Sequence, residues 1–286
     1  MRIIISFFLF FILSSSTFFA SEKQNVFYIS IDGLSRDTLY ALIQKNALPN
    51  IQEIINRGNY RNMTLDASHI TYRSSYSLLF SGKELEQSDG FDYLRPLPFK
   101  ASVFEQIKQQ HEKLYTGVMI SSPQAPEEVD SPSLLLKLAS PTIDVFKTER
   151  YRSAADVAIE VEDILAHFQS HFFVFFNFVD VEYVGRRYRE GAERYSAAVR
   201  KCDDAIGRII QSLKDRGLWE TTDFFITTNY GYQSKTQNKS KDTWIVSTRK
   251  IIKKGVSSDI VPTLYSLYDL KEDKSLYTEE QLLIEK

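Results

Sequence analysis

The sequence has 286 residues, 43% of them hydrophobic and 25% charged, and this balance excludes a largely disordered chain. The length suits one large domain with an additional segment better than two full-sized domains. The 35 basic and 37 acidic residues give a net charge of −2, so the overall charge does not favour nucleic acid as a partner. Cys202 is the single cysteine, which excludes an internal disulfide and a cysteine-based metal centre.

The first twenty residues are typical of a secretory signal. Arg2 precedes the apolar run IIISFFLFFIL, and the small residues of SSSTFFA follow it. The run is shorter than the ~20 residues that a membrane-spanning helix needs. We therefore assign residues 1–20 to a signal peptide and expect a secreted or periplasmic protein with no stable transmembrane segment after cleavage. Cleavage after Ala20, cleavage near Ser16 and an uncleaved anchor are the alternatives.

Residues 21–286 alternate between short apolar segments and amphipathic ones. In chain order, the patterns predict a strand at 25–31, helices at 36–45 and 49–57, a strand at 172–179, a helix at 193–216, strands at 223–228 and 244–246, and a helix at 260–270. Strands separated by helices indicate an α/β domain with a mostly parallel central sheet flanked by helices on both faces. The proline-rich region from about 85 to 150 is predicted as a small, irregular, loop-rich insertion.

Polar side chains gather where predicted strands end, which is where α/β proteins place their chemistry. Asp32 directly follows the first strand and suits either a cation or the capping of the next helix. Hydroxyl side chains precede the apolar run that ends at Gly82, and helix capping is their plain interpretation. The other candidates at these positions are Thr71, Tyr72, Asp180, Glu182, Asn229 and Tyr230.

The order of these segments resembles the alkaline phosphatase superfamily, in particular its type I phosphodiesterase, nucleotide pyrophosphatase and sulfatase-like branches. VFYISIDGLSRDTL resembles the opening strand of that family, FFVFFNFVDVEYVGRRYREG resembles its D-x-D-x-x-G-H motif, and DFFITTNYG resembles the strand leading to T-S-D-H-G. The resemblance covers about residues 25–84 and 170–270 and leaves 85–169 unmatched. It implies an alkaline-phosphatase-like fold and the hydrolysis of phosphoric or sulfuric esters with two zinc or similar divalent ions.

Some of the family's site residues have matches in this chain. The resemblance places the first acidic metal ligand on Asp32 and a second acid on Glu182. The nucleophile position falls on Tyr72, with Thr71 one residue away. These residues could hold at most one divalent ion of the magnesium or calcium type.

Other family positions are replaced. Arg186 stands where the second motif has a histidine, and a guanidinium cannot bind a metal. Asn229 and Tyr230 stand in place of an Asp-His pair, and no histidine follows His171. Among the four histidines, His69 is the one that we retain as a site candidate. The resemblance therefore implies no cofactor or a single divalent metal.

Two functions are consistent with this pattern. The first is an exported member of the superfamily that has lost the two-metal centre and acts as a non-catalytic binding protein for a phosphate- or sulfate-bearing ligand or for a protein. The alternative is a divergent phosphoric or sulfuric ester hydrolase that uses one metal or an arginine-rich site. Losing a two-metal clamp removes more transition-state stabilisation than one arginine restores, which favours the first.

One contact is predicted within the site. Asp32 and Arg186 follow strands whose ends open on the same cleft, so we expect them to form an ion pair that replaces the metal.

Overall fold

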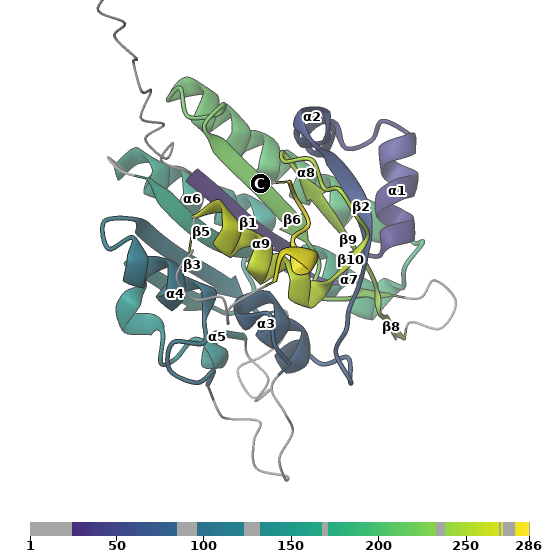
Figure 1. Cartoon of the computed structure of the whole chain (residues 1–286). Coiled ribbons are helices and arrows are strands. Elements are labelled where there is room, and N and C mark those ends of the chain that lie inside the picture. Colours follow the sequence, from purple (N-terminus) through teal and green to yellow (C-terminus); the bar gives the residue numbers. More distant parts are fainter. Residues whose placement is uncertain are drawn as a thin grey trace, which may run out of the picture.

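The computed structural model describes residues 25–84, 96–122, 132–167, 171–232, 238–268, 270 and 278–285, so the predicted signal peptide lies outside the described residues. A central eight-stranded sheet has the order β10-β2-β9-β6-β1-β5-β3-β4 (Figure 1). Its strands are β1 (Asn25–Ile31), β2 (Asn59–Thr64), β3 (Tyr115–Ser121), β4 (Val145–Glu149), β5 (Phe172–Phe178), β6 (Thr222–Thr227), β9 (Asp242–Ser247) and β10 (Gly255–Val256). Two further strands, β7 (Gly231–Tyr232) and β8 (Lys239–Ser240), pair with each other outside this sheet.

The sheet is mostly parallel, as predicted. Only β9 runs antiparallel to its neighbours β2 and β6, and every other pair in this sheet is parallel. Parallel strands are buried on both faces, and β1, β5 and β6 are buried at every position. This explains why their sequences are continuous apolar runs instead of alternating ones.

Helices cover both faces of the sheet, which confirms the predicted fold class. Helix α8 (Glu193–Asp215) packs against α1 (Arg36–Gln44), α2 (Pro49–Arg57), α6 (Ala154–His167) and α7 (Asp180–Tyr188). On the other face, in front of the sheet in Figure 1, α3 (Tyr72–Ser81) packs against α4 (Val103–Gln110), α5 (Pro132–Leu135) and α9 (Ile260–Leu267).

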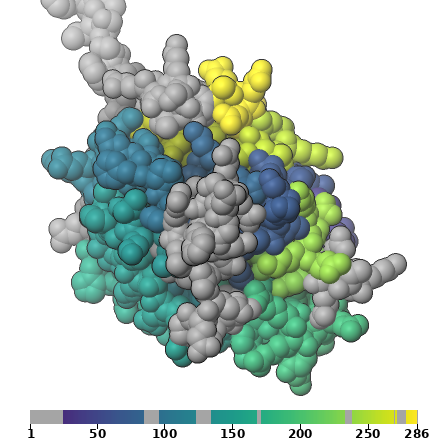
Figure 2. Space-filling view, turned by 90° about the horizontal axis from the view of Figure 1, so that it is seen from below, coloured from purple at the N-terminus to yellow at the C-terminus, as the bar shows by residue number. Residues whose placement is uncertain are grey.

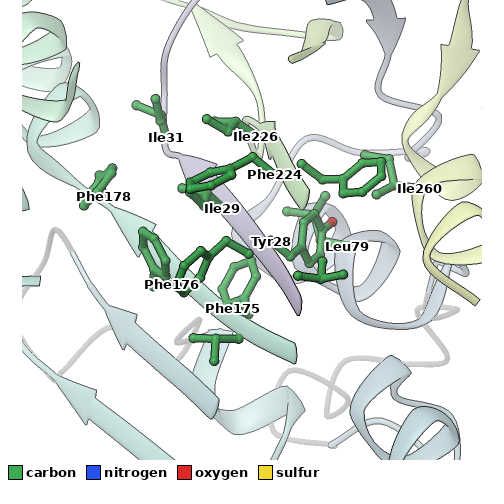
Figure 3. Close-up of a cluster of buried hydrophobic side chains, with 14 of the residues drawn as sticks. Tyr28, Ile29, Ile31, Leu79, Phe175, Phe176, Phe178, Phe224, Ile226 and Ile260 are labelled. Atoms are coloured by element: carbon green, nitrogen blue, oxygen red, sulfur yellow. The ribbon is translucent and has the colours of Figure 1, made fainter. Parts of the chain in front are cut away.

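Aromatic side chains fill the space between the sheet and these helices (Figure 3). Tyr28 and Phe175 lie on the α3 side, where Figure 3 shows them beside Leu79, and their ring centroids are 5.2 Å apart. Side chains alternate along a strand, so the residues two positions after Tyr28 and Phe175 also face α3. Those residues are Ser30 and Asn177, and this alternation aims two buried polar groups at the first turns of α3.

The predicted loop-rich insertion at about 85–150 is corrected for its described part. Strands β3 and β4 extend the central sheet beyond β5, and α4 packs against α3 and α9. The run YTGVMIS is buried at all but its first position, so its apolar character was a strand signal that the surrounding prolines masked. Residues 85–95 and 123–131 lie outside the described residues.

Across the parts of the chain that the structure describes, no helix has the length and apolar character required to cross a membrane.

Candidate functional site

The candidate residues come together because three parallel strands end side by side. Ser30 of β1 is level with Asn177 of β5 and with Thr227 of β6. The residues that follow each strand, including Asp32 and Asn229, therefore meet at one edge of the sheet. Figure 2 views the molecule from the side of this edge.

Asp32 is fully buried among neutral hydrogen-bond donors. The Ser30 hydroxyl donates to its Oδ1 over 2.6 Å, and the Asn177 amide donates to its Oδ2 over 2.8 Å. The Tyr76 hydroxyl lies 2.8 Å from Oδ1 and 2.7 Å from Oδ2. Burial raises the pKa of Asp32 to about 7; the three donors oppose the shift and the charge of Glu182 adds to it. Asp32 therefore binds a proton more readily than an ordinary carboxyl group.

Glu182 is also fully buried, but its partners include a cation. Its Oε1 atom accepts a hydrogen bond from Arg186 Nε at 2.5 Å and from the hydroxyls of Tyr230 and Tyr232, each at 2.8 Å. Burial alone would lower the pKa of Arg186, but the charge of Glu182, its hydrogen bond with Arg186 and the nearby phenols Tyr72 and Tyr230 together raise that pKa above its ordinary value. One guanidinium and two phenols thus donate to the same oxygen of Glu182.

The nucleophile candidates lie at the start of α3. The Thr71 Oγ1 atom caps the helix by accepting from the Ser74 amide at 3.0 Å, which matches the capping interpretation. The Tyr72 hydroxyl is buried and has no partner among the described residues. Burial, followed by the nearby Tyr230, raises the pKa of Tyr72 well above its ordinary value. Thr71 Oγ1 is thus used in a helix cap, and the Tyr72 phenol is held neutral.

The Asn229 side chain bonds the backbone of two residues beside the acids: Gly33, which follows Asp32, and Tyr230, whose hydroxyl bonds Glu182. Its Oδ1 accepts from the Gly33 amide at 3.0 Å and from the Tyr230 amide at 2.8 Å, while its Nδ2 is buried without a partner among the described atoms. Gly33 has φ of 73°, and a Cβ atom there would come within 2.5 Å of Glu182 Oε2. Only glycine therefore fits between the acids.

His69, a predicted site candidate, and Lys239, which was not predicted as a site residue, both lie near the start of α3. His69 is exposed, and its backbone oxygen, rather than its imidazole, contacts the site by accepting from the Ser74 hydroxyl. Lys239, from the basic segment after β7, places its Nζ 4.4 Å from the ring centroid of Tyr230 and 5.6 Å from that of Tyr72. The site thus has two cations on its outer side, Arg186 and Lys239.

The predicted ion pair of Asp32 and Arg186 is corrected. Arg186 pairs with Glu182, and no ion pair joins it to Asp32 in the described part of the chain. The reason is local: α7 begins at Asp180, so Glu182 and Arg186 are four residues apart on one helix face.

Asn177, Tyr76 and Tyr232 are site residues that the sequence analysis did not predict. Asn177 had a clear signal, since a lone amide in a buried apolar strand must find partners, and it also bonds the Ser121 backbone. Tyr76 follows Tyr72 by one helical turn, so it shares the face that the nucleophile candidates occupy. Tyr232 lies in the two-residue strand β7, where no periodic pattern marks it.

The residues present do not fit the two-metal centre that the superfamily uses. A guanidinium and two phenols occupy Glu182 Oε1, and neutral donors occupy both oxygens of Asp32. Within the described ranges, no cluster of three or more His, Cys, Asp or Glu side chains is placed to hold a metal ion. The donors around each acid leave no set of ligands for a divalent ion pair.

Known structures share this fold at low sequence identity. The lipoteichoic acid synthase LtaP from Listeria monocytogenes aligns with a TM-score of 0.61 and 13% identity over 92% of this chain and 75% of its own. A 2-O GAG sulfatase aligns with a TM-score of 0.62 and 11% identity over 89% of this chain and 72% of its own. A protein of the alkaline phosphatase superfamily from Vibrio parahaemolyticus aligns with a TM-score of 0.56 and 15% identity over 86% of this chain and 66% of its own. At these identities the likeness shows the fold alone.

Sequence comparison identifies the family. No curated protein sequence matches the chain significantly. The family model described as type I phosphodiesterase / nucleotide pyrophosphatase matches residues 103–278, which is more than half of the chain. This match includes residues 103–169, which the motif comparison had left unmatched. The chain therefore belongs to the type I phosphodiesterase / nucleotide pyrophosphatase family, within the alkaline phosphatase superfamily.

Proposed function

We propose that the chain is an exported member of this family that has lost the two-metal centre and acts as a non-catalytic binding protein. The observation that carries the proposal is the donor set on Glu182 Oε1, where Arg186 stands at the histidine position of the motif. An oxygen that accepts three hydrogen bonds, one of them from a permanent cation, would have to lose them to bind a divalent ion.

The state of the nucleophile candidates supports the same proposal. The Thr71 hydroxyl caps α3, and the raised pKa of Tyr72 keeps its phenol neutral at physiological pH. Attack on a phosphorus or sulfur centre needs an activated oxygen, and neither side chain supplies one.

The ligand that we propose follows from the charges on the outer side of the site. Arg186 lies 5.5 Å and Lys239 5.6 Å from the ring centroid of Tyr72, at the N-terminus of α3. A phosphate- or sulfate-bearing ligand suits two cations at a helix N-terminus, and a protein partner remains the other candidate. Export is proposed from the signal-like residues 1–20 alone.

One observation favours the alternative, a divergent ester hydrolase with a single metal. Three buried polar atoms of the site have no partner among the described residues: Glu182 Oε2, Asn229 Nδ2 and the Tyr72 hydroxyl. An ion or an ordered water could satisfy such atoms. The arginine on Oε1 weighs against the ion, because it already neutralises Glu182.

Metal content and turnover, measured on one preparation, separate the two functions. We expect zinc, manganese, magnesium and calcium well below about one equivalent per chain. We also expect no hydrolysis of an aryl phosphodiester or an aryl sulfate. Asp32→Ala is the test variant, and Asp37→Ala, an exposed acid on α1, is the matched control. A full equivalent of metal, with turnover that only Asp32→Ala removes, would overturn the proposal.

A further inference from the structure

A second surface of the molecule combines tyrosine and arginine side chains. We call it the Arg–Tyr strip, and it consists of Tyr151, Tyr183, Arg187, Tyr188 and Arg194. The ring centroids of Tyr151 and Tyr183 are 4.9 Å apart, and the Arg187 guanidinium lies 4.4 Å from the second ring. Arg194 lies 4.5 Å from the ring of Tyr188. The strip follows α7, whose green atoms lie on the face shown in Figure 2.

The strip is open to solvent and carries uncompensated positive charge. Tyr151 and Tyr188 are 44% and 43% exposed, and Arg187 and Arg194 are exposed as well. Neither these two arginines nor the exposed Arg189 between them forms an ion pair within the described ranges. A basic surface of this kind attracts acidic groups over distances near the Debye length.

The acids next to the strip already have partners within the chain. Asp180 accepts a hydrogen bond from Tyr151 at 3.1 Å, and Glu190 accepts from two hydroxyls at the start of α1. Glu193 pairs with Arg200 on its own helix. The positive charge of the strip is therefore left for a group outside the chain.

The backbone at the end of α7 supports a role for this charge. Arg189 has φ of 68° and ψ of 153°, a conformation that glycine adopts easily and that is strained for other residues. Two residues on, Gly191 has a similar φ of 85°. A charged side chain is thus present at a strained position directly beside the strip.

The stacked geometry suits carboxylates better than sugars. Guanidinium groups cover ring faces of Tyr183 and Tyr188, and Tyr151 packs against Tyr183, so few flat ring faces are left for sugar stacking. The rings hold the arginines in place, which lowers the entropy lost when each guanidinium pairs with a carboxylate. Tyrosine and arginine are also the residues that dominate protein–protein contacts.

We propose that the Arg–Tyr strip is a docking surface for an acidic segment of a partner protein. Carboxylates of that segment pair with Arg187 and Arg194, and its apolar side chains contact the edges of Tyr151 and Tyr188. This inference does not depend on whether the site around Glu182 is catalytic.

Fluorescence anisotropy with a labelled poly-glutamate peptide tests the proposal, with a poly-glutamine peptide of equal length as the neutral probe. We expect only poly-glutamate to bind, and its affinity to fall at least about tenfold in R187Q/R194Q, which corresponds to 1.4 kcal/mol. The control R61Q/R216Q removes the same charge from exposed arginines elsewhere and leaves affinity within about twofold. Equal losses in both double variants would overturn the proposal, because binding would then depend on net charge alone.

Two further arms test the aromatic part and the class of partner. Y188A changes no charge, and we expect it to weaken poly-glutamate binding about threefold. No change in affinity would contradict the role of the rings. Dextran sulfate serves as the polysaccharide probe: if it binds the strip more than about tenfold tighter than poly-glutamate, and R187Q/R194Q abolishes that binding, the partner is a polyanionic glycan and the proposal is wrong.

Discussion

Two fully buried carboxylates lie at the same edge of the sheet, and the protein stabilises them differently. Asp32 is surrounded by neutral donors, and its pKa rises to about 7. Glu182 forms an ion pair with Arg186 and accepts hydrogen bonds from two phenols. Arg186 therefore stabilises Glu182, whereas Asp32 depends on neutral hydrogen-bond donors and on a raised pKa that favours its protonated form.

The largest effect that we expect is the pH dependence of stability that Asp32 causes. Its folded pKa of about 7 lies above the value of 3.8 for an ordinary aspartate, so the folded state holds a proton that the unfolded state releases. The stability gained is fully present below pH ~4 and is lost as the pH rises through ~7. A rise of the pKa from 3.8 to about 7 corresponds to about 4 kcal/mol.

Asp32→Asn isolates this contribution, because all other titrating groups are shared with the wild-type chain. The free energy of unfolding, measured with urea at several pH values, should increase in the variant relative to wild type by about 4 kcal/mol between pH 4 and pH 8. Parallel curves would mean that Asp32 is stabilised as an ion, and the contrast between the two acids would be lost.

The second largest effect concerns the cation of Glu182. Arg186→Met removes the guanidinium but keeps much of the side-chain volume, and it leaves a buried carboxylate with two hydroxyl donors. We expect a loss of about 3 kcal/mol in the free energy of unfolding, at the lower end for a broken buried pair because the Arg186 side chain is 27% exposed.

Two controls accompany this variant. Arg187→Met changes the next residue, which is exposed and stacks on Tyr183, and should cost no more than about 1 kcal/mol. The double variant Glu182→Gln/Arg186→Met removes both charges and should recover most of the lost stability. If the double variant is less stable than Arg186→Met, Glu182 is not the group that needs the cation.

Much of the fold could be predicted because its signals are local. Helix α2 begins at a proline and ends at Gly58, and its apolar residues recur with helical spacing, so the predicted bounds 49–57 are confirmed. The strands β1 and β5 were recognisable as apolar runs between polar turns. Strand β3 was missed because its apolar run lies between proline-rich segments.

The composition of the site was less predictable than its position. Asp32, Glu182 and Asn229 follow strands, so the topology alone brings them together. Their partners depend on contacts that no spacing in the sequence specifies. Tyr76 of α3 bonds Asp32, and Tyr232 of the two-residue strand β7 bonds Glu182. The pairing of Arg186 was predicted wrongly because the helical start of α7 was not recognised.

The third prediction compares two tyrosine hydroxyls of α3: that of Tyr76, which bonds Asp32, and that of Tyr72, which has no partner among the described residues. Tyr76→Phe removes the phenol that bonds both oxygens of Asp32. Below pH ~7 Asp32 is neutral, and the variant should lose about 1 kcal/mol in the free energy of unfolding. Above pH ~7 the hydrogen bond stabilises a charge, so the loss should rise to about 2–3 kcal/mol.

Tyr72→Phe is the matched control for this change. Its hydroxyl is buried without a partner among the described residues, so removing it should leave stability unchanged or raise it by about 1 kcal/mol at every pH. Both variants are measured by urea unfolding at pH 5 and pH 8. A cost for Tyr76→Phe that does not vary with pH would contradict the titration of Asp32 in this range.

The smallest effect is expected for Lys239, and it separates a nearby cation from a bonded one. Lys239 lies over the ring of Tyr230 at 4.4 Å, whereas Arg186 bonds Glu182 directly. Loss of the cation–π contact in Lys239→Met should therefore cost about 0.5–1 kcal/mol, clearly less than the ~3 kcal/mol expected for Arg186→Met. The same urea measurements decide the matter. If Lys239→Met and Arg186→Met lose the same free energy of unfolding, both cations stabilise the charge of Glu182 through their electric field. The contrast with Asp32 would then depend on the total positive charge near each acid instead of on one ion pair.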